Sequence, residues 1–329
     1  MKKIAVLSVA IMVLSICGCS KKEAASGGEG ASGGVDFSGK SVSCIVPYDA
    51  GGGTDAVMRF AANAASKNFK NITVENRSGA GGAIGMLYGA QSKPDGSVIT
   101  MVTVELATLE AMGNNAGLTY SMFKPIMLLN SACSAITVRA DDARFQTLGD
   151  FIEYSKTNKV NVGNSGVGAI WHLAAAGLAK VAGTTFNHVG YNGAAGAITD
   201  LLGGHIDAVA VSFAEVSQYV ASGDFKVLGV MSNERLEAIP DVPTCKEAGY
   251  DAILGTWRGL AVPKDTPDDV VNELYNIFAE AAQSEEFVNN MNNSNNVIEI
   301  MDGQSFYKMI GDQLNLYTEL VNELGLKVQ

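Results

Sequence analysis

The sequence predicts an α/β fold in which mainly parallel sheets are flanked by helices. From Lys40 onward, short apolar runs alternate with amphipathic helical patterns, and this alternation is typical of βα units. Several loops between the two are rich in glycine, which totals 37 of 329 residues, about half again its usual share of roughly 7%. The length favours two domains, since one domain commonly spans roughly 100 to 200 residues.

The first part of the chain contains strands, glycine-rich loops and helices in turn. An apolar stripe that starts at Val57 predicts a helix, for which Thr54 is the expected N-cap. The elements predicted here are a strand at 42–46, a glycine-rich loop at 47–54, the helix just described, a strand at 72–75, a second glycine loop at 79–82 that opens a helix, a turn at 94–96 and a strand at 98–104.

The middle of the chain repeats this order and the end is helical. Thr147 with Asp150 three residues later predicts a capping box at a helix start. The elements predicted after that helix are a strand at 160–162, a glycine loop at 163–168, a helix at 169–181, a strand at 186–189, a loop at 190–193, a helix at 194–202, a strand at 206–211, a helix from Pro267 onward and a terminal helix at 306–324.

Residues 1–18 have the pattern of a lipoprotein signal peptide. Lys2 and Lys3 precede an apolar run that is shorter than the roughly 20 residues of a membrane span. The run ends in Ile-Cys-Gly-Cys, which resembles the bacterial lipobox and predicts lipidation of Cys19, although Cys17 departs from the usual Ala or Ser. Residues 19–39 then form a flexible tether. The alternative is an ordinary secretory signal with incidental cysteines, and in both cases the chain is exported.

Charge and cysteine content narrow the function classes. The chain has 23 Lys and Arg against 34 Asp and Glu, a net charge of −11, and no basic stripe, so nucleic acid is a poor partner. An acidic chain can still bind a small anion through backbone N–H groups and helix ends. Beyond the signal region, Cys44, Cys133 and Cys245 do not form the pattern of a disulfide framework and are interpreted as small buried hydrophobic residues.

Motifs for catalysis, metal binding and cofactor binding are weak. Ser165 lacks the flanking glycine of a nucleophile elbow, the glycine stretches fit neither nucleotide-binding pattern, and the three histidines lack metal-ligand spacing. We therefore expect no catalytic residues, no metal and no cofactor. The glycine loops instead lead into helix N-termini at the carboxyl ends of strands, which suits an anion, although glycines there also simply close tight turns.

Several segments in order resemble one family. IVPYDAGGGTDAVMR, VENRSGAGGAIG, PDG, GVGAIWHLAAAGLA, DLLGGHIDA, IPDVPTCKEAG and TWRGLAVPKDTP together resemble the solute-binding receptors of tripartite tricarboxylate transporters, the Bug receptor family. The resemblance runs from about Lys40 to the C-terminus. It implies a two-lobe periplasmic-binding-protein fold with a ligand cleft between lobes, lobe 1 at 40–140 plus 255–329 and lobe 2 at 141–254. It also implies a small organic anion, a carboxylate, that is delivered to integral membrane permease subunits.

The resemblance also suggests ligand-binding residues. Ala169 and Asn192 depart from the family pattern, which leaves the identity of the ligand open. The residues carried over or placed nearby are Tyr48, Ala50, Gly51, Gly52, Gly53, Thr54, Asp55, Gly79, Ala80, Gly81, Gly82, Ser165, Gly166, Gly168, His172, Asp207 and Arg258.

Four of these residues have competing interpretations. His172 is better explained by helix packing than by ligand binding, Asp207 by closing a turn, and Asp55 by a favourable charge in the first helical turn, from which it could still meet a ligand ammonium. Arg258 could pair with the ligand carboxylate or could form a salt bridge at the surface or between the lobes. Two functions remain open: a lipid-anchored receptor that does not alter its ligand, and an exported hydrolase or transferase that acts on a small carboxylate.

Overall fold

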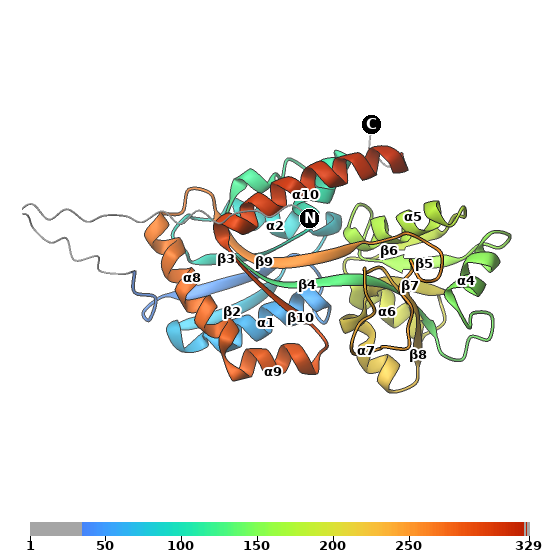
Figure 1. The fold of residues 1–329 in the computed structure, drawn as a ribbon. Helices are drawn as coiled ribbons and strands as arrows, with labels where there is room; N and C mark the ends of the chain where they lie inside the picture. The colour runs from blue at the N-terminus through green and yellow to red at the C-terminus, as the bar shows by residue number, and fades with distance from the viewer. Residues whose placement is uncertain (1–34, 326, 328–329) are drawn as a thin grey trace, which may run out of the picture. The chain divides into compact units, whose positions relative to one another are not determined.

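The strands of the computed structural model lie in one mixed ten-stranded sheet, in which β4 (Phe123–Arg139) is shared by two groups of strands (Figure 1). The structure describes residues 35–325 and 327, so the predicted signal peptide, Cys19 and the first part of the predicted tether lie outside it. β4 has different partners along its length, and we name the two groups of strands accordingly. Half-sheet A is the group joined, directly or through another strand, to residues 123–133 of β4. Half-sheet B is the group joined in the same way to residues 134–139.

Half-sheet A contains β1 (Ser41–Val46), β2 (Asn71–Asn76), β3 (Val98–Thr103), β9 (Gly255–Pro263) and β10 (Val297–Asp302) beside the first part of β4. Half-sheet B contains β5 (Asn161–Asn164), β6 (Asn187–Gly190), β7 (Ala208–Ser212) and β8 (Phe225–Val230) beside the rest of β4. The main strand order is β2-β1-β3-β9-β4-β7-β5-β6.

The predicted α/β class is confirmed, but the sheets are mixed rather than mainly parallel. Pairs β1–β2, β1–β3, β5–β6 and β5–β7 are parallel, as βα units require. Every pair that involves β4 or β9 is antiparallel. Neither of these two strands was predicted from the sequence, and they run side by side through the middle of the fold (Figure 1).

Helices cover both faces of half-sheet A. One face packs against a buried cluster that contains Val57, Leu274 and Phe287, and the other against a cluster that contains Met86 and Phe306. The helices of the first face are α1 (Gly53–Ala65), α8 (Asp268–Gln283) and α9 (Glu285–Asn293); those of the second are α2 (Ala83–Ala90), α3 (Glu105–Met112) and α10 (Gly303–Leu324).

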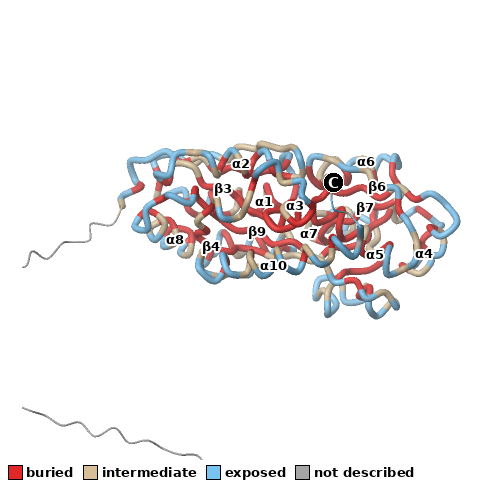
Figure 2. Tube along the Cα trace, turned by 90° about the horizontal axis from the view of Figure 1, so that it is seen from above, coloured by how far each residue is buried: buried red, intermediate tan, exposed pale blue. Residues whose placement is uncertain are grey.

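Half-sheet B is covered in the same way. Alternate residues of β7 face opposite clusters: Ala208 and Ala210 pack with one, and Val209 and Val211 with the other. The helices are α4 (Leu148–Ser155) and α5 (Ile170–Val181) on one face, and α6 (Ala194–Leu202) and α7 (Phe213–Ala221) on the other. Figure 2 shows the result, with strands and inner helix faces buried and the connecting turns exposed.

Local sequence predictions have mixed outcomes. The Thr147–Asp150 capping box is present, and α6 spans the predicted residues. The N-cap of α1 is Gly52 rather than Thr54; Thr54 is the second residue of the helix, and its hydroxyl accepts a hydrogen bond from Arg258. Within the described residues, no helix is long and apolar enough to cross a membrane. The two-lobe division remains a proposal, which we place where β4 changes partners between Cys133 and Ser134.

Candidate functional site

A small buried cavity of about 20 Å³ lies where the carboxyl ends of parallel strands from both half-sheets meet. Tyr48 follows β1, Glu105 follows β3, Ser165 follows β5, and Glu215 lies in the helix that follows β7. This is the position at which open α/β sheets bind ligands. The cavity is lined by Tyr48, Gly52, Gly53, Thr54, Thr103, Glu105, Ser165, Ile170, Trp171, Gly193, Ala194, Glu215, Thr256 and Arg258.

Several helices point their N-termini at this cavity. The first residues of α1, α3, α5 and α6 line it, as does a residue in the first turn of α7. The first N–H groups of a helix have no partner within the helix, and the helix dipole adds partial positive charge there. The cavity therefore favours carboxylate groups, whether they come from a ligand or from the protein.

Glu215 joins the two half-sheets at the cavity. Its Oε1 accepts a hydrogen bond of 3.0 Å from the N–H of Gly53, the first residue of α1. Its Oε2 accepts hydrogen bonds of 3.0 Å and 2.8 Å from the N–H and hydroxyl of Ser212. These contacts hold the α7 N-terminus in half-sheet B against the α1 N-terminus in half-sheet A.

Glu105 forms a second connection of the same kind. Its Oε1 accepts a 2.9 Å hydrogen bond from the N–H of Ile170 at the start of α5, and its Oε2 accepts one from the Thr103 hydroxyl. The hydroxyl of Tyr48 lies 3.3 Å from Thr103 Oγ1 and donates to the carbonyl oxygen of Gly81 at 3.2 Å. Burial, with the nearby charge of Glu105, raises the pKa of Tyr48 well above its ordinary value, so this phenol stays protonated.

Arg258 supplies the positive side chain of the cavity. The residue is only 2% exposed; its Nε donates to Thr54 Oγ1 at 3.0 Å and its Nη1 to Asn130 Oδ1 at 2.6 Å. Its Nη2 lies 3.9 Å from Oε1 of Glu215, an ion pair without a hydrogen bond. Burial lowers the pKa of Arg258, but a guanidinium remains a cation in proteins.

The structure brings some of the predicted site residues together. Tyr48, Gly52, Gly53, Thr54, Ser165 and Arg258 line the cavity. Ala50 and Gly51 are exposed on the outer side of the first loop. Gly79, Ala80, Gly81 and Gly82 do not line the cavity but lie beside it, since a Cβ added to Gly82 would come within 2.9 Å of the Tyr48 hydroxyl.

The predicted residues of the loop after β5 mostly support the cavity from behind. The hydroxyl of Thr108 donates to the carbonyl oxygen of Gly168 at 3.0 Å, and the N–H of Gly166 donates to the side chain of Asn164. His172 accepts a 3.3 Å hydrogen bond from the N–H of Gly168 through Nδ1, and its ring packs at 85° against His188 with 4.6 Å between centroids. His172 therefore fixes this loop and does not line the cavity.

Two of the residues carried over from the resemblance, Asp55 and Asp207, do not line the cavity and have other partners. Asp55 accepts hydrogen bonds from Gly51, Arg59 and Asn76, so its carboxylate stabilises the first loop from within. Asp207 lies at the amino end of β7, away from the carboxyl ends that form the cavity. It pairs with Arg144 at 2.8 Å and accepts the N–H of Asn161.

Sequence reasoning missed the acidic residues of the cavity. Glu215 had a readable signal, because Ser212 and Glu215 have the spacing of a capping box and follow a predicted strand. Glu105 had none, since it meets Ile170 only in the folded chain. The lining residues that were not predicted are Thr103, Glu105, Ile170, Trp171, Gly193, Ala194, Glu215 and Thr256.

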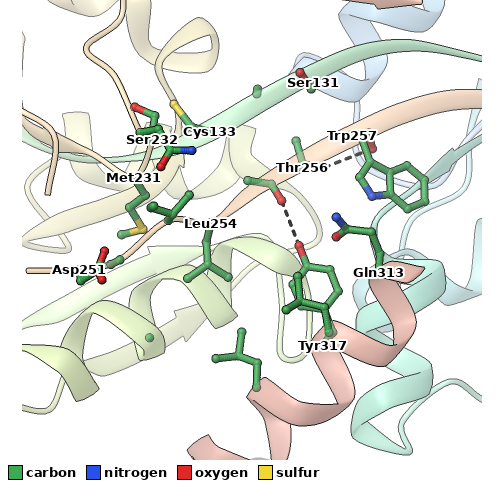
Figure 3. A pocket seen from close by; sticks show the side chains of 18 of the residues that line it. Ser131, Cys133, Met231, Ser232, Asp251, Leu254, Thr256, Trp257, Gln313 and Tyr317 are labelled. Atoms are coloured by element: carbon green, nitrogen blue, oxygen red, sulfur yellow. Dashed lines mark hydrogen bonds between the residues drawn. The ribbon is translucent and has the colours of Figure 1, made fainter. Parts of the chain in front are cut away.

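A larger pocket of about 670 Å³ lies on the other face of β4 and β9 (Figure 3). Successive residues of a strand face opposite sides, so Trp257 lines this pocket whereas Arg258 lines the small cavity. Figure 3 shows Gln313 and Tyr317 of α10 pointing toward β9. Lys180 and Val181, at the C-terminal end of α5, line it as well; helix C-termini carry partial negative charge and do not attract anions.

An α/β sheet shared by two groups of strands, with a cavity between them that is surrounded by helix N-termini, defines the chain as a solute-binding protein of the periplasmic-binding-protein class. The chain matches the model of the tripartite tricarboxylate transporter family receptor over residues 57–326 and belongs to that family. It is therefore an exported solute-binding receptor and not an enzyme, so the alternative of a hydrolase or transferase is wrong.

Individual proteins support this membership. A UPF0065 protein of Bordetella pertussis is 30% identical over 298 residues, 89% of this chain and 92% of that protein. A TctC solute-binding protein from Polaromonas, crystallised with no ligand, is 40% identical with a TM-score of 0.64, covering 86% of this chain and 98% of that one. The periplasmic binding protein BugD is 29% identical with a TM-score of 0.83, and the match covers 88% of this chain and 99% of that one.

More distant structures share the fold. MatC from Rhodopseudomonas palustris, solved with bound malate, is 22% identical with a TM-score of 0.80 and covers 86% of this chain and 99% of that one. A second R. palustris protein, solved with adipate, is 20% identical with a TM-score of 0.81 and covers 87% and 97%.

Proposed function

We propose that this receptor captures a small carboxylate outside the cytoplasmic membrane and delivers it to the integral membrane subunits of a tripartite tricarboxylate-type transporter. The observation that carries the proposal is the convergence of several helix N-termini and the Arg258 guanidinium on one buried cavity. Such an arrangement stabilises a carboxylate without a metal or a cofactor. The malate and adipate in the two distant structures are small carboxylates.

Binding requires the cavity to open. Its volume of about 20 Å³ is far smaller than the roughly 300 Å³ at which small-molecule pockets begin, so the lining residues must separate to admit a ligand. Half-sheets A and B share β4, and β9 runs beside it. We infer that these two strands form the hinge, that the half-sheets are the centres of the two lobes, and that the lobes close on the ligand.

The residues that we propose to contact the ligand are those that line the cavity. Among the sequence-predicted residues these are Tyr48, Gly52, Gly53, Thr54, Ser165 and Arg258. Lipidation of Cys19 and a tether at residues 19–39 would keep the receptor at the membrane surface, close to its permease.

A thermal-shift screen of the purified soluble domain over mono-, di- and tricarboxylates and amino acids tests the proposal. A ligand at about 100 times its dissociation constant adds roughly 2.7 kcal/mol to the free energy of unfolding. The same compounds with the carboxylate replaced by a primary amide serve as controls and should give no shift. If no carboxylate raises the melting temperature above its amide control, the proposed function is wrong.

A further inference from the structure

The charged side chains that line the cavity give it a net negative charge. Glu105, Glu215 and Arg258 are the charged groups among its described lining residues, and their side chains are almost completely buried. The hydrogen-bond partners of the two carboxyl groups are all donors, namely backbone N–H groups and two hydroxyls. Donors on every side suit the ionised form, so two carboxylates face one guanidinium.

The two glutamates already occupy most of the helix N-termini at the cavity. Glu215 lies in the first turn of α7 and accepts the first N–H of α1. Glu105 is the first residue of α3 and accepts the first N–H of α5. The chain's own carboxylates therefore accept the first N–H groups of α1 and α5, and they place negative charge at the N-termini of α3 and α7, which would otherwise attract a ligand anion.

Two positive groups at the cavity have no carboxylate hydrogen-bonded to them in the described structure. The α6 N-terminus is capped by Gly193, which has no side chain to accept its N–H groups. The Arg258 side chain is only 2% exposed, and the 3.9 Å distance from its Nη2 to Oε1 of Glu215 is beyond hydrogen-bond length. Both groups line the same cavity, together with the hydroxyl-bearing residues Ser165 and Thr256. This leaves a position for one ligand carboxylate.

We propose that Glu105 and Glu215 determine ligand specificity and select amino acids, which carry one α-carboxylate and one ammonium group. This rests on the proposed function above. The ligand carboxylate binds the α6 N-terminus and Nη2 of Arg258, and the ammonium binds the oxygens of the two glutamates. An amino acid is a neutral zwitterion and leaves the cavity with its one excess negative charge, whereas a carboxylate without the ammonium raises that excess to two; a second carboxylate adds further repulsion, which is strong in a buried, low-dielectric site.

Isothermal titration calorimetry on matched pairs tests the selection. Each pair differs by the replacement of the ammonium group with hydrogen: L-alanine and propionate, L-leucine and 4-methylpentanoate, L-glutamate and glutarate. We expect the amino acid to bind about 100-fold more tightly in the pair that fits the cavity best, which corresponds to roughly 2.7 kcal/mol.

Neutral variants assign the selection to the glutamates. Glu215→Gln and Glu105→Gln keep an oxygen acceptor for Gly53 and Ile170 respectively while removing the charge. Each variant should reduce the preference for the amino acid to less than about ten-fold, because it weakens binding of the amino acid and strengthens binding of the matched carboxylate without the ammonium. Glu153→Gln, on the exposed face of α4, is the matched control and should leave the preference unchanged.

The outcomes separate this inference from the proposed function. If the deaminated carboxylate binds as tightly as the amino acid in the wild-type protein, the inference is overturned while the carboxylate receptor stands. If the amino acid is preferred but both folded glutamine variants keep that preference, the role given to Glu105 and Glu215 is wrong. If no carboxylate binds in the broader thermal-shift screen, the proposed function fails and the inference fails with it.

Discussion

The contact between Gly53, Glu215 and Arg258 predicts a sharp difference between two neighbouring glycines. A Cβ added at Gly53 would lie 2.9 Å from Nη2 of Arg258 and 3.1 Å from Cγ of Glu215. Arg258 is buried and bonded to Thr54 and Asn130, so it cannot move aside without losing those bonds. A Cβ added at Gly52 would meet its nearest atom, Oε1 of Glu215, at 3.9 Å, which is an ordinary contact. Neither glycine has a positive φ, so backbone strain does not enter the comparison.

The expected cost of Gly53→Ala follows from these distances. Overpacking of this kind costs about 1–3 kcal/mol, and weakening the hydrogen bond to the Glu215 carboxylate adds a cost of about 1.5–3 kcal/mol. The gain of alanine over glycine in a helix returns about 0.5–1 kcal/mol. We therefore expect Gly53→Ala to lower the free energy of unfolding by about 1.5–5.5 kcal/mol and to weaken ligand binding, since the cavity lining is displaced.

Urea denaturation and calorimetry on both variants measure the difference. Gly52→Ala replaces an N-cap glycine and should cost no more than about 1 kcal/mol. If Gly53→Ala is as stable as Gly52→Ala and binds the ligand with equal affinity, the close contact between α1 and Glu215 is not part of the folded protein in solution, and the cavity has been placed wrongly.

Three further predictions test separate parts of the molecule. Burial, with a contribution from His188, lowers the pKa of His172 to about 4 from 6.5, so the unfolded chain binds more protons below pH 6.5 and stability falls as the pH decreases toward 4. Between pH 7 and pH 5, the free energy of unfolding of the wild-type protein should fall by about 2 kcal/mol more than that of His172→Asn. The amide oxygen of this variant can still accept the hydrogen bond from the Gly168 N–H. If urea denaturation shows the same decrease for both proteins, the prediction is wrong. Asp207→Asn should reduce stability by weakening its pair with Arg144 while leaving ligand affinity within about two-fold, and a severe loss of affinity in calorimetry would restore Asp207 to the binding site. Cys19→Ala should remove the acyl group and the partitioning into detergent, and a wild-type protein whose intact mass shows no acyl group would refute lipidation.

The sequence predicted those elements that carry their own local signals. The capping box at Thr147 and the glycine-rich loops ahead of α1 and α5 are short-range patterns, and the structure contains the helices that they indicate. β4 escaped prediction because it is buried on both faces along most of its length and therefore lacks the alternation of a half-buried strand. Its polar residues, Asn130 among them, also interrupt the apolar run.

The cavity was predicted only in part because its charges come together through tertiary contacts. Gly53 and Glu215 are 162 residues apart, and Arg258 and Thr54 are 204 apart. The glycine-rich loops indicated where an anion would be stabilised, and several of their residues do line the cavity. The same loops gave no sign that glutamates of the chain itself occupy these helix N-termini, because a sequence pattern shows which helix begins where but not which side chain reaches its first N–H.

The glutamates link closure of the receptor to the charge of its ligand. Glu215 belongs to half-sheet B, whereas its partners Gly53 and Arg258 belong to half-sheet A, so any separation of the two breaks a hydrogen bond and an ion pair. A hydrogen bond to a charged group is worth roughly 1.5–3 kcal/mol, which is modest enough for thermal opening yet large enough to favour the closed form. A zwitterionic amino acid adds no net charge to the cavity that closure buries, whereas a carboxylate without an ammonium increases its negative charge. The charge of the ligand would therefore affect the equilibrium between the open and closed forms as well as the direct interaction between ligand and cavity. Neutral variants of Glu215 should change this equilibrium and the ligand preference together.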